Sequence, residues 1–315
     1  MKRYNLPNRA DWFQICSRPI FEKNELEKSV KAILEGVKTD GDEAVFSYTE
    51  KFDGVRINEL RVSENEILNA QDMVCNDLKQ AIQEAKTNIE KFHLSQKETL
   101  QPIETTEGVV CWRKSIGIEK VGLYIPGGSA PLFSTILMLG IPAVQAGCKE
   151  IVLCTPPDEK GDINPAILYT AKLVGITEIY KIGGAQGIAA MAYGTASIPK
   201  VYKIFGPGNQ FVTKAKELIQ QEGVAIDMPA GPSEVLIIAD ATCNPAFVAA
   251  DLLSQAEHGP DSQVILVSPD EKVLEQTQKE LSIQLDLLPR KEIAEKALKN
   301  SKAILCSSME ECIEL

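Results

Sequence analysis

The chain has little of what binds nucleic acid or crosses a membrane. Lysine and arginine total 33 against 44 aspartate and glutamate residues, a formal net charge of -11, and no basic stripe interleaved with aromatic residues occurs. Because polyanions are bound through clustered cations, neither nucleic acid nor an anionic membrane is an expected partner. The longest apolar run, residues 132–144, is interrupted by serine, threonine, glycine and proline. We therefore expect no membrane span and, in the opening MKRYNLPNRADWF, no signal peptide.

Several standard motifs are also missing. None of the eight cysteines stands in a CxxC pair, so we expect reduced, mostly buried thiols in a cytoplasmic protein. The sequence contains neither a GxGxxG dinucleotide fingerprint nor a GxSxG nucleophile elbow. Of its two histidines, His93 lies among lysine, glutamate and glutamine residues and is expected to be solvated.

At 315 residues the chain is long enough for two domains. Residues 24–96 carry a helical pattern, in which apolar residues recur every three or four positions between Leu78 and Phe92. Ser63 and Glu66 have the spacing of a capping box at the head of an earlier helix. We expect a helical N-terminal layer that packs on something larger or helps to build a dimer.

From about residue 109 short β-branched runs alternate with glycine-rich turns and helical segments. This alternation predicts an α/β fold with a parallel sheet and helices on both of its faces. In such sheets ligands bind at the carboxyl ends of the strands. The expected strands lie within residues 121–128, 150–156, 178–187, 200–209, 234–240, 263–269 and 303–307.

Three of these strands end in glycine turns that open onto helices: YIPGG, GGAQG and GPGN. Glycine lets a phosphate or a nucleotide approach the backbone, and a helix N-terminus favours anions. Each turn taken alone is better explained as a tight connection between strand and helix. Three in one sheet leave a nucleotide or phosphorylated ligand as an open alternative, with Tyr124 placed to stack on a ring or to pack.

The stretch NPAFVAADLLSQAEHGPDSQ predicts a helix capped by Asn244 and ended by Gly259 and Pro260. Gln255 and His258, three residues apart, are then expected on one face of its last turn. An amide oxygen and an imidazole can bind a metal or a polar ligand, but two ligands do not close a metal site. The competing interpretation is a histidine that only caps the helix C-terminus.

Two further chemistries stay open at this point. Ser233, in the stiff segment DMPAGPSE, is able to bind a substrate carboxylate or amine, or only its own backbone. A cysteine thiolate is able to trap an aldehyde, but nothing near Cys148 or Cys154 in the sequence lowers a thiol pKa, so burial is the better explanation for both.

Taken together and in this order, YIPGG, GGAQG, IFGPGN, DMPAGPSE and SQAEHGPDSQ make the chain resemble the histidinol dehydrogenases. The resemblance runs through the whole chain. It implies two successive NAD-dependent oxidations, from L-histidinol through an aldehyde to L-histidine, at the end of histidine biosynthesis. It also implies a zinc-containing homodimer with two Rossmann-like domains, related in fold to the aldehyde dehydrogenases.

Carried over position by position, the resemblance implies that Tyr124, Gln186 and Asn209 contact NAD. It implies a substrate contact for Ser233, and contacts with both zinc and substrate for Gln255 and His258. The family's catalytic Glu-His pair and its other two zinc ligands would stand beyond Leu315. We therefore expect this sequence to be an incomplete version of a longer protein, inactive by itself, with no catalytic residue of its own.

The resulting prediction is an α/β protein in three parts: a mainly helical segment with a joining strand over residues 1–119, an NAD-binding Rossmann-like domain over 120–235, and a second Rossmann-like domain over 236–315 that carries half of the zinc and substrate site. Two alternatives stand beside the dehydrogenase. One is a non-catalytic module of the same fold that binds a nucleotide or metabolite. The other is an enzyme that works through a cysteine, like the aldehyde dehydrogenases.

Overall fold

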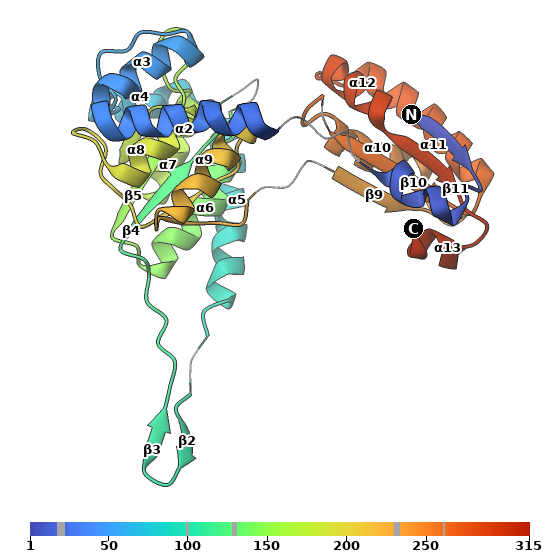
Figure 1. The fold of residues 1–315 in the computed structure, drawn as a ribbon, viewed down its shortest axis with the longest axis horizontal. Coiled ribbons are helices and arrows are strands. Elements are labelled where there is room, and N and C mark those ends of the chain that lie inside the picture. The colour runs from blue at the N-terminus through green and yellow to red at the C-terminus, as the bar shows by residue number, and fades with distance from the viewer. Residues whose placement is uncertain (18–22, 99–100, 128–130, 230–233, 261) are drawn as a thin grey trace. The chain divides into compact units, whose positions relative to one another are not determined.

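The computed structural model describes residues 1–17, 23–98, 101–127, 131–229, 234–260 and 262–315. The chain forms two compact units (Figure 1). The large unit is Glu22–Ala230, and the small unit combines Met1–Phe21 with Gly231–Leu315. Each unit is built on its own parallel sheet.

The large unit contains a five-stranded parallel sheet in the order β6-β5-β4-β7-β8. The chain enters at the central strand β4, adds β5 and β6 on one side, and then crosses back to add β7 and β8 on the other. The predicted α/β class is therefore confirmed for this part of the chain. The strands are β4 (Lys120–Tyr124), β5 (Glu150–Thr155), β6 (Glu178–Lys181), β7 (Lys203–Phe205) and β8 (Ala225–Ile226).

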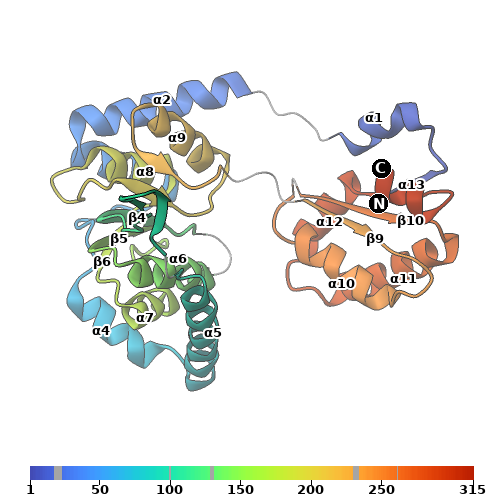
Figure 2. The same ribbon diagram turned by 90° about the horizontal axis from the view of Figure 1, so that it is seen from below.

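Helices cover both faces of this sheet, and Figure 2 shows the layers. One face packs against α6 (Phe133–Ala146) and α7 (Pro165–Val174). The other packs against α8 (Gly184–Tyr193) and α9 (Gln210–Gln221). Successive residues of a strand point to opposite faces, so Leu123 joins the first core and Tyr124 the second.

The N-terminal helical layer predicted for residues 24–96 is confirmed as α2 (Lys23–Asp40), α3 (Asp42–Asp53), α4 (Glu64–Met73) and α5 (Asn76–Ser95). Helix α2 packs on α8 and α9, whereas α4 packs on α7 and α5 on α6. The apolar stripe with which α2 enters the core has helical spacing and consists of Val30, Ile33, Leu34 and Val37. Burial of a whole valine side chain contributes about 2 kcal/mol to the free energy of unfolding.

The start of α4 is defined by local sequence. The Ser63 hydroxyl accepts a hydrogen bond from the Glu66 amide, and the Glu66 carboxylate accepts one from the Ser63 amide, at 3.2 and 2.9 Å. The predicted capping box is thus confirmed.

Between α5 and β4 lies an exposed antiparallel ribbon of β2 (Ile103–Thr106) and β3 (Val109–Cys111).

The small unit has a four-stranded parallel sheet in the order β1-β11-β10-β9. Its strands are β1 (Lys2–Asn5), β9 (Glu234–Ile238), β10 (Gln263–Ser268) and β11 (Lys302–Leu305). One face packs against α10 (Pro245–Ala256), α11 (Glu271–Leu287) and α12 (Lys291–Asn300). The other packs against two short helices, α1 (Trp12–Cys16) and α13 (Met309–Glu314).

The prediction of a continuous N-terminal segment over residues 1–119 is wrong at its start, because Lys2–Asn5 is a strand of the small unit's sheet. Its partner β11 lies about 300 residues away in the sequence, and strand pairing over that distance leaves no local pattern. A short 3-10 helix, Arg9–Asp11, follows β1.

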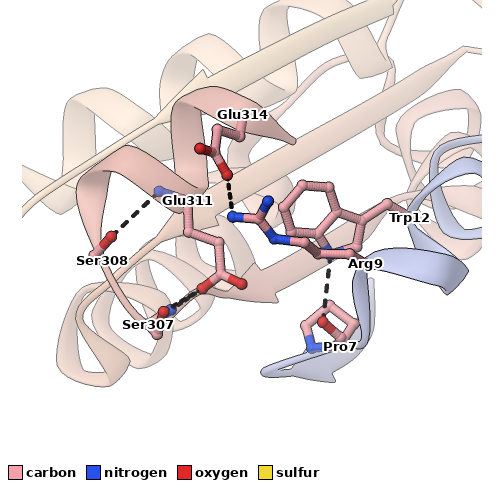
Figure 3. A network of polar contacts seen from close by, with 7 residues as sticks. All are labelled: Pro7, Arg9, Trp12, Ser307, Ser308, Glu311 and Glu314. Atoms are coloured by element: carbon pink, nitrogen blue, oxygen red, sulfur yellow. Dashed lines mark hydrogen bonds and ion pairs between the residues drawn. The ribbon is translucent and has the colours of Figure 1, made fainter.

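Side chains from both ends of the chain meet on the face of the small unit's sheet that α1 and α13 cover (Figure 3). Arg9 forms an ion pair with Glu314, and its guanidinium lies 5.2 Å from the centre of the Trp12 ring. The Trp12 indole donates a hydrogen bond of 3.3 Å to the carbonyl oxygen of Pro7. The Ser308 hydroxyl accepts from the Glu311 amide at 3.2 Å, which confirms the predicted cap of α13. These contacts help to close this face of the sheet.

Candidate functional site

A cleft of about 1690 Å³ opens at the carboxyl ends of the large unit's strands. Its floor consists of the turns that follow the strands, and helices α2, α3 and α4 supply side chains to its rim. The strand ends and the segments after them contribute Tyr124, Pro126 and Gly127 from β4 onward, residues 155–160 from β5 onward, residues 184–186 after β6, and Asn209 and Phe211 after β7.

The topology explains why the cleft lies here. The connections leaving β4 and β7 run in opposite directions, so the helices that follow them lie on opposite faces of the sheet. Such a reversal leaves a crevice at the strand ends that no helix fills. The three residues that the resemblance assigns to NAD, Tyr124, Gln186 and Asn209, all line this cleft.

Tyr124, the last residue of β4, is 3% exposed. Its phenol oxygen accepts a hydrogen bond of 3.1 Å from the amide of Gly184, at the start of α8. Burial raises the pKa of the Tyr124 phenol well above its usual value, so the group stays protonated. The side chain therefore ties two strand ends together and still has a proton to donate.

Gln186 lies in the first turn of α8 and is 1% exposed. Its amide nitrogen Nε2 is buried and has no hydrogen-bond partner in the described part of the chain. An unsatisfied buried donor costs roughly 1–3 kcal/mol, which a ligand's acceptor would recover. Gly184 makes room for this amide: its φ is +60°, and a Cβ there would lie 2.5 Å from Gln186 Oε1.

Asn209 caps helix α9. Its side-chain oxygen accepts from the amides of Phe211 and Val212 at 3.0 and 3.1 Å. The cap uses the oxygen, so the amide nitrogen is the group that remains to face a ligand in the cleft.

A partly buried ion pair holds the turn before Asn209. The amide of Gly206 donates to Asp227 at 2.8 Å, and the Lys216 ammonium donates to the carbonyl oxygen of Gly206 at 2.9 Å. Lys216 is 2% exposed and also pairs with Asp227. Gly206 has a φ of +133°, and a Cβ there would lie 2.1 Å from the carbonyl oxygen of Tyr124. Lys216 and Asp227 thus position this turn. Neither was among the predicted site residues, although Asp227 opens the DMPAGPSE segment.

The residues expected to bind substrate and zinc belong to the small unit, and Ser233 lies outside the described residues. Helix α10 begins as predicted, with the Asn244 side chain accepting from the Ala246 amide at 3.0 Å. The prediction that Gln255 and His258 share its last turn is wrong, because α10 ends at Ala256. His258 stands in the following turn, where its amide donates to the carbonyl oxygen of Gln255 at 3.3 Å.

The end of α10 offers two donors to a metal: the amide of Gln255, which is partly buried, and the imidazole of His258, which is exposed. Within the described ranges, no three His, Cys, Asp or Glu side chains gather into a metal-binding group. A zinc site usually takes three or four protein ligands. Gln255 and His258 therefore fit part of such a site.

The two cysteines considered as nucleophiles, Cys148 and Cys154, are not activated thiols. All eight cysteines are free. Cys154 is fully buried in β5, and burial raises the pKa of its thiol far above the usual value. Burial also raises the pKa of Cys148. Because the thiolate is the reactive form, neither is activated. Burial, the explanation favoured from the sequence, is confirmed for Cys154, whereas Cys148 is only partly buried. The expectation that most of the thiols are buried is wrong, because only three of the eight are.

The fold and cleft are those of a doubly wound α/β protein, a class of parallel-sheet proteins that bind ligands at the carboxyl ends of their strands. A sequence profile of the histidinol dehydrogenases matches residues 16–315. The chain belongs to the histidinol dehydrogenase family.

Individual relatives agree with this assignment. The chain is 56% identical over its full length to the histidinol dehydrogenase of Bacteroides thetaiotaomicron, of which it covers 74%. It is 53% identical over 305 residues to that of Mannheimia succiniciproducens, covering 96% of this chain and 70% of the relative. A crystal structure of histidinol dehydrogenase from Elizabethkingia anophelis matches all of this chain and 72% of that one, with 58% identity and a TM-score of 0.95.

The described part of the chain contains no helix with the length and hydropathy of a membrane span.

Proposed function

We propose that the protein oxidises L-histidinol through an aldehyde to L-histidine, with NAD as the oxidant. Membership of the family implies NAD use. The observation that carries the proposal is the meeting of Tyr124, Gln186 and Asn209 in one cleft at the sheet's switch point.

The proposed NAD site uses polar groups that the fold leaves without other tasks. Gln186 Nε2 is a buried donor with no partner in the described chain, and the Asn209 amide nitrogen is not used by its cap. The start of α8 supplies backbone amides behind a glycine turn, where a phosphate is favoured. When bound, NAD would accept the hydride that leaves the substrate carbon.

The proposed substrate site uses Ser233, Gln255 and His258, with Gln255 and His258 also binding zinc. The zinc would hold the substrate's imidazole and amine, so its contribution is positioning. Within this chain, the amide oxygen of Gln255 and the imidazole of His258 orient the substrate. We further propose that the protein works as a cytoplasmic homodimer; its free cysteines agree with a reducing compartment.

The test is NADH formation, followed at 340 nm with L-histidinol and zinc. It is run on the 315-residue chain and on the product of the whole reading frame, because the chain covers 74% and 70% of the lengths of the two relatives named above. Reduction of NAD by the longer product supports the proposal. If neither protein reduces NAD while both bind it, the protein is a nucleotide-binding module and the proposal fails.

Loss of activity in a Gln255→Ala variant, with the Cys154→Ala variant still active, supports the proposed chemistry over a thiol mechanism. The opposite pattern would favour the thiol.

A further inference from the structure

One acidic side chain in the cleft has no role in the function proposed above. Asp53 is the last residue of α3, followed by Gly54, and it lines the cleft together with Tyr124. The residue is partly buried, and its Oδ2 atom is fully buried without a hydrogen-bond partner in the described part of the chain. A carboxylate only accepts hydrogen bonds, so this oxygen is left without a donor among the described residues and is able to accept one from a ligand.

The surroundings make this position costly for a charged group. Burial raises the pKa of the Asp53 carboxyl to about 6. The Asp53 charge also lies close enough to Tyr124 to help raise the pKa of that phenol, after the larger effect of burial. The fold therefore keeps an acid where it destabilises the protein, a pattern typical of a functional site.

The position of Asp53 suggests which donor it meets. Tyr124 is one of the three residues proposed to contact NAD, so Asp53 would lie beside the bound cofactor. Of the cofactor's parts, the ribose rings carry neighbouring hydroxyl groups that donate to a single carboxylate, an arrangement that nucleotide-binding α/β sheets use repeatedly. Added phosphate at the ribose 2′ position would remove one donor and bring a second negative charge against the carboxylate.

We propose that the Asp53 carboxylate accepts a hydrogen bond from the 2′-hydroxyl of the dinucleotide's adenosine ribose and thereby selects NAD over its 2′-phosphorylated form, NADP. The proposal rests on the proposed function, since it requires the cofactor to bind in this cleft. It assigns the selectivity to the N-terminal helical layer, because Asp53 comes from α3 and not from the sheet.

The test is equilibrium binding of NAD and NADP by titration calorimetry at pH 8, with wild-type protein and the Asp53→Asn variant. Loss of a charged hydrogen bond is expected to weaken NAD binding about tenfold. NADP binding should stay unchanged or improve, so the preference for NAD falls by at least about tenfold. The melting temperature of Asp53→Asn should hold or rise, because a poorly solvated charge has been removed; a purely structural role for Asp53 would lower it.

Asp40→Asn is the matched control. Asp40 is also the last residue of a helix, α2, and is also followed by a glycine, but it is exposed and does not line the cleft. If Asp40→Asn changes the preference as much as Asp53→Asn does, net charge is responsible and the proposal is overturned. It is also overturned if Asp53→Asn weakens NAD and NADP equally, or neither.

The Gln186→Ala variant distinguishes failure of the role proposed for Asp53 from failure of the proposed NAD binding in the cleft. If wild-type protein binds NAD and Gln186→Ala weakens the binding while Asp53→Asn leaves the preference unchanged, only the role of Asp53 fails. If wild-type protein binds neither nucleotide, the proposed function and the role of Asp53 fail together.

Discussion

The two units use the same building blocks, parallel strands joined by helices, and differ in strand order. In the large unit the order reverses at β4, with β5 and β6 on one side and β7 and β8 on the other. In the small unit β9, β10 and β11 follow one another in sequence order, and β1 adds at the edge. Crossover connections between parallel strands are right-handed, and here each one leads to the next strand on the same side. The helices α10, α11 and α12 therefore lie on one face of the sheet.

The difference shows how strand order creates a binding site. The large unit has a cleft of about 1690 Å³ at its strand ends, whereas a pocket of about 670 Å³ in the small unit lies beside β1 and α1. The small unit's second face is covered by α1 and α13. The strand order of the small unit has no reversal between β9, β10 and β11. Its proposed functional groups, Gln255 and His258, lie at the end of helix α10. Two kinds of ligand site follow, and variants in each should act separately.

The largest effect is expected from the ion pair that holds the cleft's turn. Lys216→Met leaves Asp227, whose side chain is 28% exposed, without its partner, and should lower the free energy of unfolding by about 3 kcal/mol. Scanning calorimetry should show a lower transition temperature and weaker NAD binding. Lys214→Met, two residues earlier and paired with Glu217 nearer the surface, should cost about 1 kcal/mol or less. Equal costs for the two variants would contradict the role of Lys216.

Removing the imidazole of the small unit should affect only metal and substrate. His258→Ala is expected to weaken zinc binding about 100-fold, because a ligand is lost outright. Competition with a zinc-sensitive dye measures this, and the affinity for NAD should not change. A loss of NAD affinity in this variant would break the separation between the units.

The reciprocal change is Gln186→Ala in the large unit. Its buried amide nitrogen has no partner in the described chain, so its removal should weaken NAD binding by about tenfold or more. Titration calorimetry measures the change, with zinc binding as the internal control. Unchanged NAD affinity would remove Gln186 from the proposed site.

The smallest effect concerns stability and pH. The pKa of Asp53 is about 6 in the folded protein, above the ordinary value of 3.8. Between these values the folded state binds more protons than the unfolded state, so stability due to this group falls as pH rises from about 4 to 6. Because Asp53 is partly exposed, we expect a loss of only about 1 kcal/mol. Denaturant titrations of wild-type protein should show this slope, and Asp53→Asn should flatten it; identical slopes would be evidence against the raised pKa.

Much of the fold is written locally in the sequence. The capping box at Ser63, the cap at Asn244 and the glycine turns that open α8 and α9 depend on residues a few positions apart, and they were predicted. The pairing of β1 with β11 was not, because it joins opposite ends of the chain. The end of α10 at Ala256 also differed from the prediction, which relied on the next glycine and proline as the stop signal.

The site divides in the same way. Tyr124, Gln186 and Asn209 stand in or beside recognisable glycine turns, and parallel strands necessarily bring those turns to one edge. Asp53 and Lys216 carry no such signal. Each acquires its position only through the packing of its helix, α3 against α2 and α8 for Asp53 and α9 against the sheet for Lys216. Burial and partners, and not local spacing, therefore identify them.

The central claim is that NAD binds in the large unit's cleft. Hydrogen exchange read by mass spectrometry tests it most directly, since it locates the ligand without requiring turnover. With saturating NAD, peptides that contain Tyr124, Gln186 and Asn209 should exchange more slowly, while peptides from β9, β10 and α10 should not change. Slower exchange confined to β9, β10 or α10, with no change around Tyr124, Gln186 and Asn209, would contradict NAD binding in the large unit's cleft.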